Sequence, residues 1–279
     1  MKKLFYCMAM LLLCAACNKG NKTNQTEEQS DSTVQTEQAN NAPEALAFDS
    51  CHWKDSVSFG SDNVARVDLS CTYPKAGNQQ LVDSINYWIC EEFGDTLHKQ
   101  HNDIKRLLST KGRKQLKSDS KELKMILDEG GPDYVSFESN IDISVEYEDA
   151  DYITMNTQTY YYMGGAHGSS YAAGTTFRKS DGRRMGWLLL DGMSLSQIRK
   201  NIKAGLKEYF EVKTDQELLD CLLIGDPLDD TSAQQTYDRA FPLPVTPPYI
   251  NSKGINIIYQ QYEITPYAAG MPSFIISKQ

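Results

Sequence analysis

Two spacings of apolar residues divide the first half of the chain into strands and helices. Residues 55–59 and 64–73 have the composition of two strands, and the polar residues 60–63 join them as a turn. A helix is expected next, because Leu81, Ile85, Ile89 and Phe93 recur every four residues. A charged helical stretch then extends to residue 129, where Gly130, Gly131 and Pro132 end it.

The middle of the chain alternates between apolar and polar positions. In residues 134–147 the apolar side chains share one parity and the polar ones the other, which predicts a half-buried strand. Residues 152–163 return as its antiparallel neighbour, and 171–179 form another extended run. Asp181 and Gly182 then predict a tight turn, after which a further extended piece is expected.

Helices and strands are expected again in the last third. Ser194 with Gln197, and Thr214 with Glu217, have the spacing of capping boxes at helix starts. Residues 226–248 are dotted with proline and predict an irregular loop, with an extended segment at 241–245, and strands are expected at 255–262 and 274–277. Strands, helices and strands in this order predict an α+β fold, with antiparallel sheets packed against helices in two small domains.

The N-terminus has the layout of an export signal. Residues 1–16 place two lysines before an apolar run that is too short to span a bilayer, and small residues precede Cys17 as in a bacterial lipobox. Cys17 is therefore the expected lipid-attachment site, and cleavage near Ala16 by an ordinary secretory route is the alternative. Residues 17–44 are polar and predict a tether. We expect a periplasm-facing outer-membrane lipoprotein with domains at 45–135 and 136–279.

Charge narrows the choice of partners. The chain has 28 basic and 37 acidic residues, a net charge of −9, and loss of Lys2 and Lys3 with the signal leaves −11. This balance disfavours nucleic acid as a partner and would attract a cationic protein. The sequence shows no phosphate-binding loop, nucleophile elbow or calcium-loop spacing, so neither a cofactor nor a metal is expected.

Four cysteines follow the lipid-attachment site, in a compartment that permits disulfides. Cys51 and Cys71 are equidistant from the turn near residue 61. They would therefore face each other across the hairpin, and they are the candidate disulfide. The alternative is that all four, including Cys90 and Cys221, are free thiols.

A set of motifs spans much of residues 155–279. They are Tyr162-Met163-Gly164-Gly165-Ala166-His167, Asp181-Gly182, Trp187 to Leu190, Gly254-Ile255 and Tyr262-Glu263-Ile264-Thr265-Pro266-Tyr267-Ala268-Ala269-Gly270. This region resembles DUF3298, the domain of unknown function in RsiV-type anti-sigma factors and in PdaC-type peptidoglycan deacetylases. Residues 57–86 resemble the smaller, DUF4163-like domain that precedes it. Within the motifs Gly164, Gly165, Asp181, Gly182, Pro266 and Gly270 are expected to be structural.

The resemblance implies a binding role. RsiV-type domains receive lysozyme, and the anti-sigma and deacetylase segments of the relatives are missing here. We therefore expect a non-catalytic lipoprotein that binds a protein, such as a cationic lysozyme, or an envelope glycan. An enzyme or enzyme-accessory domain acting on peptidoglycan or another envelope glycan is the alternative.

The candidate ligand-binding residues are mostly tyrosines, which combine a broad apolar face with a polar tip. They are Tyr160, Tyr162, His167, Tyr262 and Tyr267. Each has a structural alternative: the tyrosines could pack within strands, and His167 could fasten its loop to backbone carbonyl groups. No catalytic residue is assigned.

Overall fold

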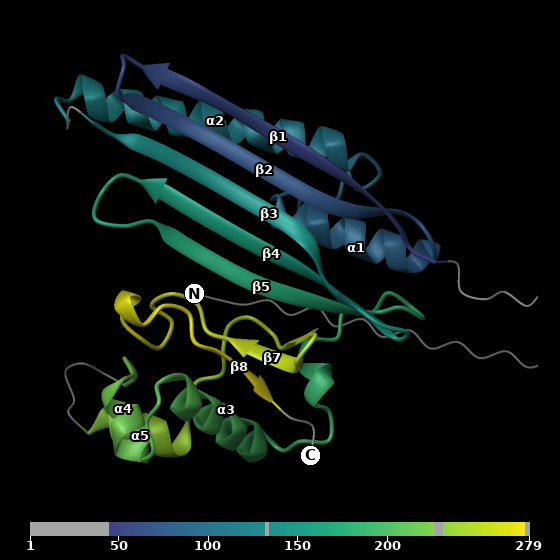
Figure 1. Ribbon diagram of the computed structural model, residues 1–279, viewed down its shortest axis with the longest axis vertical. Helices are drawn as coiled ribbons and strands as arrows, with labels where there is room; N and C mark the ends of the chain where they lie inside the picture. Colours follow the sequence, from purple (N-terminus) through teal and green to yellow (C-terminus); the bar gives the residue numbers. More distant parts are fainter. Residues whose placement is uncertain (1–44, 132–133, 226–230, 277–279) are drawn as a thin grey trace, which may run out of the picture. The chain divides into compact units, whose positions relative to one another are not determined.

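Long alternating segments build a five-stranded sheet in the order β1-β2-β3-β4-β5 (Figure 1). The strands are β1 (Ala47–Phe59), β2 (Asn63–Ala76), β3 (Ser136–Glu148), β4 (Tyr152–Met163) and β5 (Ser169–Arg178). β1 with β2, β3 with β4 and β4 with β5 are antiparallel, whereas β2 and β3 are parallel because two helices connect them.

The computed structural model describes residues 45–131, 134–225 and 231–276. The expected signal at 1–16, Cys17 and the whole of the expected tether therefore lie outside the described residues. In the part that is described, no helix is both long enough and apolar enough to cross a membrane.

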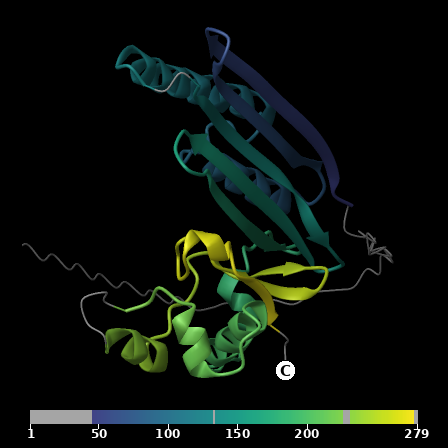
Figure 2. The same cartoon turned by 60° about the vertical axis from the view of Figure 1, so that its left-hand side comes forward.

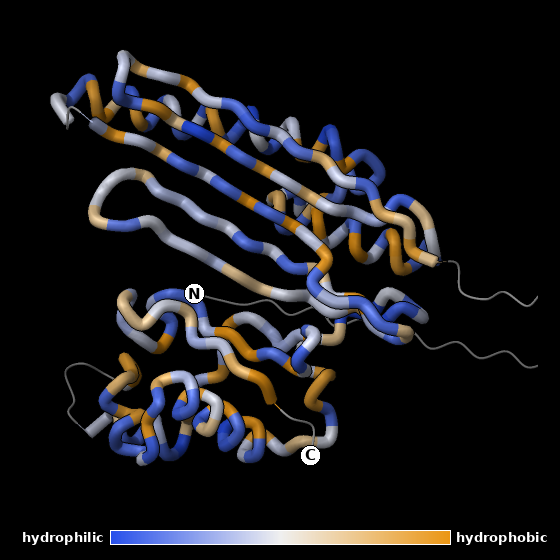
Figure 3. Tube along the Cα trace, viewed as in Figure 1, coloured by the Kyte–Doolittle hydropathy of each residue, from blue (hydrophilic) through white to orange (hydrophobic). Residues whose placement is uncertain are grey.

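Two helices cover one face of the sheet, as the views of Figures 1 and 2 both show. They are α1 (Gln79–Glu92), capped by the Asn78 side chain, and α2 (Ile104–Asp128), capped by Asp103. Their apolar stripes pack on the apolar parity of the strands, and Leu69, Ile85 and Leu108 are almost completely buried there. Along β2 and β3 hydrophobic and hydrophilic residues alternate (Figure 3), so the opposite face of the sheet is polar.

A second hydrophobic cluster forms around a three-stranded sheet in the order β6-β7-β8. Its elements are η1 (Gly186–Leu190), α3 (Leu195–Tyr209), α4 (Asp215–Asp220), α5 (Ser232–Arg239), β6 (Tyr249–Asn251), β7 (Gly254–Ile258), η2 (Tyr267–Ala269) and β8 (Ser273–Ile276). The capping boxes predicted at Ser194 and Thr214 are both present. Helices packed with these two sheets confirm the predicted α+β class.

Three expected elements of this second half differ in the structure. The expected loop contains α5, which the pattern missed because only Tyr237 of that helix is buried. The extended piece expected after Gly182 is short: Arg184 pairs antiparallel with Phe177 of β5, and the chain then enters the 3₁₀ helix η1, since a run of four apolar residues fits a strand or a helix. β7 ends at Ile258, before the expected residue 262, and Tyr262 has a positive φ that no strand adopts.

The expected division of the domains between residues 135 and 136 falls inside the five-stranded sheet. β2 and β3 are hydrogen-bonded partners, with Leu69 opposite Ile141, so both strands belong to one layer. The last buried residue of the first hydrophobic cluster is Phe177, and the first buried residue of the second cluster is Leu189. The hydrophobic cores therefore divide the chain between β5 and η1.

Candidate functional site

Adjacent cross-strand rows of side chains lie on the part of the sheet's polar face that β6 leaves open. At the other end of this face Tyr249 packs on Gly174, and the Ile250 amide donates to the Thr176 hydroxyl at 2.9 Å. One row runs through Lys54, Asp68, Asn140, Tyr160 and Ser170, and the next through His52, Ser70, Asp142, Gln158 and Ala172. Cross-strand partners lie close enough for their side chains to interact. The sheet thus gathers amide, carboxyl and hydroxyl groups that are far apart in the sequence.

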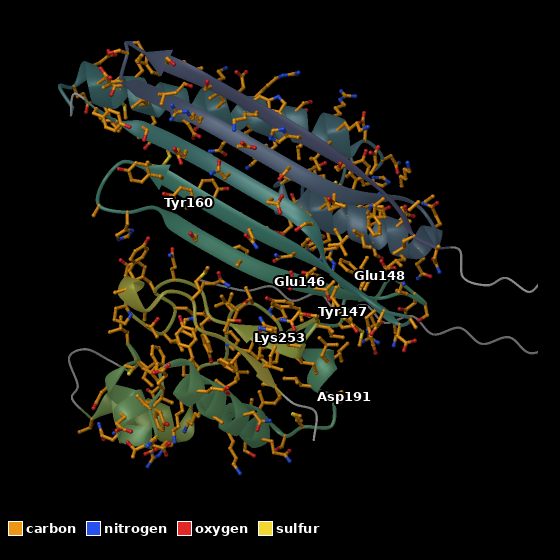
Figure 4. All side chains as sticks on the ribbon, viewed as in Figure 1. Glu146, Tyr147, Glu148, Tyr160, Asp191 and Lys253 are labelled. Atoms are coloured by element: carbon orange, nitrogen blue, oxygen red, sulfur yellow. The ribbon has the colours of Figure 1, made fainter. Side chains whose placement is uncertain are left out.

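These rows line a shallow depression of about 480 Å³, which we call the polar groove. Tyr160 lies near the end of β4 (Figure 4), and its side chain is about one third exposed. Met271, from the segment before β8, also lines the groove. The lining residues are Asp68, Ser70, Asn140, Ile141, Asp142, Gln158, Thr159, Tyr160, Ser170, Tyr171, Ala172 and Met271.

Two carboxylates of the groove are held by neighbouring side chains. Asp68 lies 2.6 Å from His52 Nε2 and 2.7 Å from Lys54 Nζ, and the Ser70 hydroxyl donates to Asp142. Burial opposes ionisation of Asp68, but the hydrogen bonds from Lys54 and His52 outweigh it and lower its pKa. Asp68 is therefore an ionised acceptor at neutral pH.

Three of the predicted site residues form an aromatic cluster, defined here as His167, Tyr262 and Tyr267. The His167 ring stacks on Tyr267 with 3.7 Å between the ring centroids. His167 Nδ1 lies 3.0 Å from the Gly168 carbonyl oxygen and must donate to it, so Nε2 accepts from the Tyr262 hydroxyl at 3.2 Å. Both ring nitrogens are thus engaged within the protein, which is the geometry expected if His167 fastens its loop.

The other two predicted tyrosines shape the loop between β4 and β5. Gly164 and Gly165 both have positive φ values, and the Tyr162 hydroxyl donates to the Gly165 carbonyl at 3.1 Å. The Tyr160 ring lies against Gly168, where a Cβ atom would come within 2.4 Å of it. Tyr160 therefore connects the loop to the polar groove, whereas Tyr162 serves the turn.

Glutamine side chains bring the C-terminal segment to the outer edge of β5. Gln260 accepts from the Ala172 amide at 3.1 Å and donates to the Ala172 carbonyl at 2.8 Å, and Gln261 accepts from the Ser170 amide at 2.7 Å. These bonds replace the pairing that a further strand would give. They also place the aromatic cluster beside the groove, since Ser170 lines it.

The remaining motif residues have structural surroundings. Arg178 forms a two-pronged ion pair with Asp181, and this hydrogen bonding lowers the pKa of Asp181 to about 2. Gly182 has a φ of 68°, and a Cβ atom there would lie 2.7 Å from the Gln80 carbonyl oxygen. Pro266 precedes η2, and Gly270 ends it with a φ of 72°.

Cys51 and Cys71 are directly opposite each other in the β1-β2 register, as the sequence predicted, and both are free thiols in the structure. The hydrogen bond between the two thiols lowers the pKa of Cys51 and raises that of Cys71. Cys51 is therefore the better nucleophile for forming a bridge.

Treatment with oxidised glutathione should link Cys51 to Cys71. Cys90 should remain unlinked, because burial raises the pKa of its thiol to about 11. Mass spectrometry of non-reduced digests is the measurement, with a Cys71→Ser variant as the control. Two free thiols after the treatment, or a link from Cys51 to Cys221, would contradict the prediction.

Sequence reasoning missed most of the groove. Asp142 was noticed only as a member of the polar parity of its strand, and Asn140 and Gln158 gave no signal. One sequence signal could identify these residues: they alternate with apolar residues in two strands that are predicted to be neighbours. In the described ranges no group of three or more His, Cys, Asp or Glu side chains has an arrangement that could hold a metal ion.

The described chain is an α+β protein with a polar groove on one face of its larger sheet and an aromatic cluster beside it. Residues 61–170 match the family model described as deacetylase PdaC, and residues 188–279 match that of DUF3298, a protein family of unknown function. These matches confirm the DUF3298 and PdaC parts of the expected resemblance, but the DUF3298 match begins at residue 188, so the motif at residues 162–167 lies in the PdaC match instead. No curated protein matches the chain significantly.

Two crystal structures of DUF3298 family proteins are similar to the chain. One, from Bacteroides fragilis, has a TM-score of 0.64 at 19% identity, and the other, from Pseudomonas aeruginosa, has 0.52 at 12%. Each comparison covers 84% of this chain and 91% of the other. At these identities the similarity shows a shared fold.

Proposed function

We propose that the chain is a non-catalytic lipoprotein of the cell envelope, anchored through Cys17, whose polar groove binds an envelope glycan. The observation that carries this proposal is the pair of adjacent rows on the sheet face. They present Asn140 and Gln158 amides and Asp68 and Asp142 carboxylates around one depression, with the Tyr160 ring at its side.

This set of groups suits a sugar. Each sugar hydroxyl both donates and accepts hydrogen bonds, so it pairs with amides and carboxylates together, and the apolar face of a pyranose packs on an aromatic ring. Residues 61–170 match a family model described as a deacetylase, and this match supports a ligand that carries acetyl groups. N-acetylated glycans of the envelope belong to that class.

The enzyme alternative has one observation in its favour: His52, Ser70 and Asp142 occupy one cross-strand row. A nucleophilic serine needs a hydrogen bond to its base. Here the Ser70 hydroxyl donates to Asp142, while His52 bonds to Asp68 and more than half of its side chain is exposed. This arrangement supports binding more than hydrolysis.

Calorimetry with tetra-N-acetylchitotetraose tests the proposal. The double variant Asn140→Ala/Gln158→Ala should bind about tenfold more weakly, since each lost hydrogen bond contributes about 0.5–1.5 kcal/mol. Asn102→Ala/Gln80→Ala is the matched control, because it removes two exposed amides elsewhere and should leave the affinity unchanged.

The same experiment separates the alternatives. Equal affinity of the groove variant and the unaltered chain, or no binding of the oligosaccharide, would refute the glycan site. Release of acetate or of shorter oligosaccharides during incubation would favour the enzyme. Binding of a cationic lysozyme in place of the oligosaccharide would favour a protein receptor.

A further inference from the structure

A second cavity, of about 740 Å³, lies in the other hydrophobic unit between α3 and α5. It shares no residue with the polar groove, and no motif pointed to it. The lining residues are Leu195, Ser196, Arg199, Lys200, Lys203, Ala204, Lys207, Asp215, Tyr237, Asp238, Arg239 and Phe241. We call it the basic cavity.

The charge of this lining is opposite to that of the chain. It includes five basic and two acidic side chains, a formal net charge of +3 within a protein of −9. The lysines of α3 recur at positions 200, 203 and 207, a spacing that places them along one side of the helix. A local positive field in an acidic protein is a feature expected of an anion site.

Internal contacts hold three of the cations in place. Lys203 Nζ lies 3.9 Å from the centre of the Tyr237 ring, and Arg199 Nε donates to the Phe241 carbonyl at 2.9 Å. Lys207 pairs with Asp215 at 2.6 Å, and the same carboxylate accepts from the Tyr237 hydroxyl at 2.9 Å. The wall of the cavity is therefore ordered before any ligand arrives.

Two cations are left for a ligand. Lys200 and Arg239 have no ion-pair partner within residues 45–131, 134–225 and 231–276, and both side chains are exposed. Of the two lining carboxylates, Asp215 is shared between Lys207 and Tyr237, and Asp238 accepts from Gln234 at 2.9 Å. Within the described residues neither carboxylate forms an ion pair with Lys200 or Arg239.

We propose that the basic cavity binds a small phosphate-bearing ligand. Phosphate oxygens accept charge-assisted hydrogen bonds from arginine and lysine together, while Phe241, Leu195 and Ala204 offer apolar surface to the rest of the ligand. The volume lies within the range of about 300–1,000 Å³ typical of small-molecule sites. A soluble phosphate ester and a phospholipid headgroup share this chemistry.

Two soluble probes distinguish these sources: inorganic pyrophosphate, and dihexanoylphosphatidylglycerol below its micelle concentration. Binding to the full chain in a nonionic detergent is followed by calorimetry. Lys200→Gln/Arg239→Gln should weaken binding of the recognised probe about tenfold or more, because two charge-assisted contacts are lost. A response to pyrophosphate indicates a soluble ester, and a response to the lipid alone indicates a headgroup.

The matched control removes the same charge from another surface. Lys117→Gln/Lys121→Gln lies on the exposed side of α2 and should retain the affinity of the unaltered chain. Failure of both probes to bind, or equal losses in the two double variants, would overturn the proposal. Glycan binding in the polar groove should be unchanged by either variant, so the two sites can fail independently.

Discussion

Gly205→Val should lower the free energy of unfolding by about 3 kcal/mol or more, because this glycine is where α3 meets β8. A Cβ atom at position 205 would lie 2.1 Å from a carbon of the Phe274 ring. Phe274 is itself 8% exposed and belongs to the second hydrophobic cluster, so the ring has little room to move. Overpacking of this kind commonly costs about 1–3 kcal/mol, and a branched side chain adds to it.

The neighbouring position supplies the control. Ala204 is exposed on the same helix, so Ala204→Val should cost only the few tenths of a kcal/mol that separate the helix propensities of the two residues. Urea unfolding followed by circular dichroism measures both variants. Similar stability of Gly205→Val and Ala204→Val would show that the contact between α3 and β8 can relax.

The sequence could not reveal this close approach. A glycine inside a helical pattern indicates only a weak helix former, and its role depends on Phe274, which follows about seventy residues later in the chain. Gly112 in α2 is a second case, since a Cβ atom there would lie 2.1 Å from the Trp53 ring of β1. Such contacts depend on how the helices and strands pack together, and the spacing of apolar residues does not predict them.

Local signals were predicted well because each depends on neighbouring residues. The β1-β2 hairpin has Cys51 opposite Cys71 as expected, and Ser194 with Gln197 caps α3. The parallel pairing of β2 with β3 was missed, since α1 and α2 separate the two strands in the chain. Nothing in either strand alone specifies that partner.

The candidate site was predicted only in part, because its residues come from strands and loops that are far apart in the sequence. Tyr262 and His167 were both singled out, and they meet although 95 positions separate them. The polar groove was not predicted, because each of its strands contributes only a few polar side chains, and these occur on any exposed sheet face. Their combination becomes visible only when the order of β2, β3, β4 and β5 is known.

Gln260→Leu should also destabilise the protein, by about 1–3 kcal/mol, because it removes the side chain that completes the edge of β5. Gln260 is 9% exposed, and its amide makes hydrogen bonds to both the nitrogen and the oxygen of Ala172. Leucine has a similar size but neither a donor nor an acceptor. Both groups of the half-buried Ala172 would then lose a partner, and each lost hydrogen bond costs about 0.5–1.5 kcal/mol.

Amide hydrogen exchange measures both where the protein is destabilised and by how much. The Ala172 amide should exchange much faster in Gln260→Leu, whereas the amide of Met155 in the centre of the sheet should change only as far as global stability falls. Gln216→Leu is the matched control, since Gln216 is exposed on α4 and its side chain donates to the exposed Asp220. Unaltered protection of Ala172 would mean that the C-terminal segment is held to β5 by other contacts, among them the bond from Ser170 to Gln261.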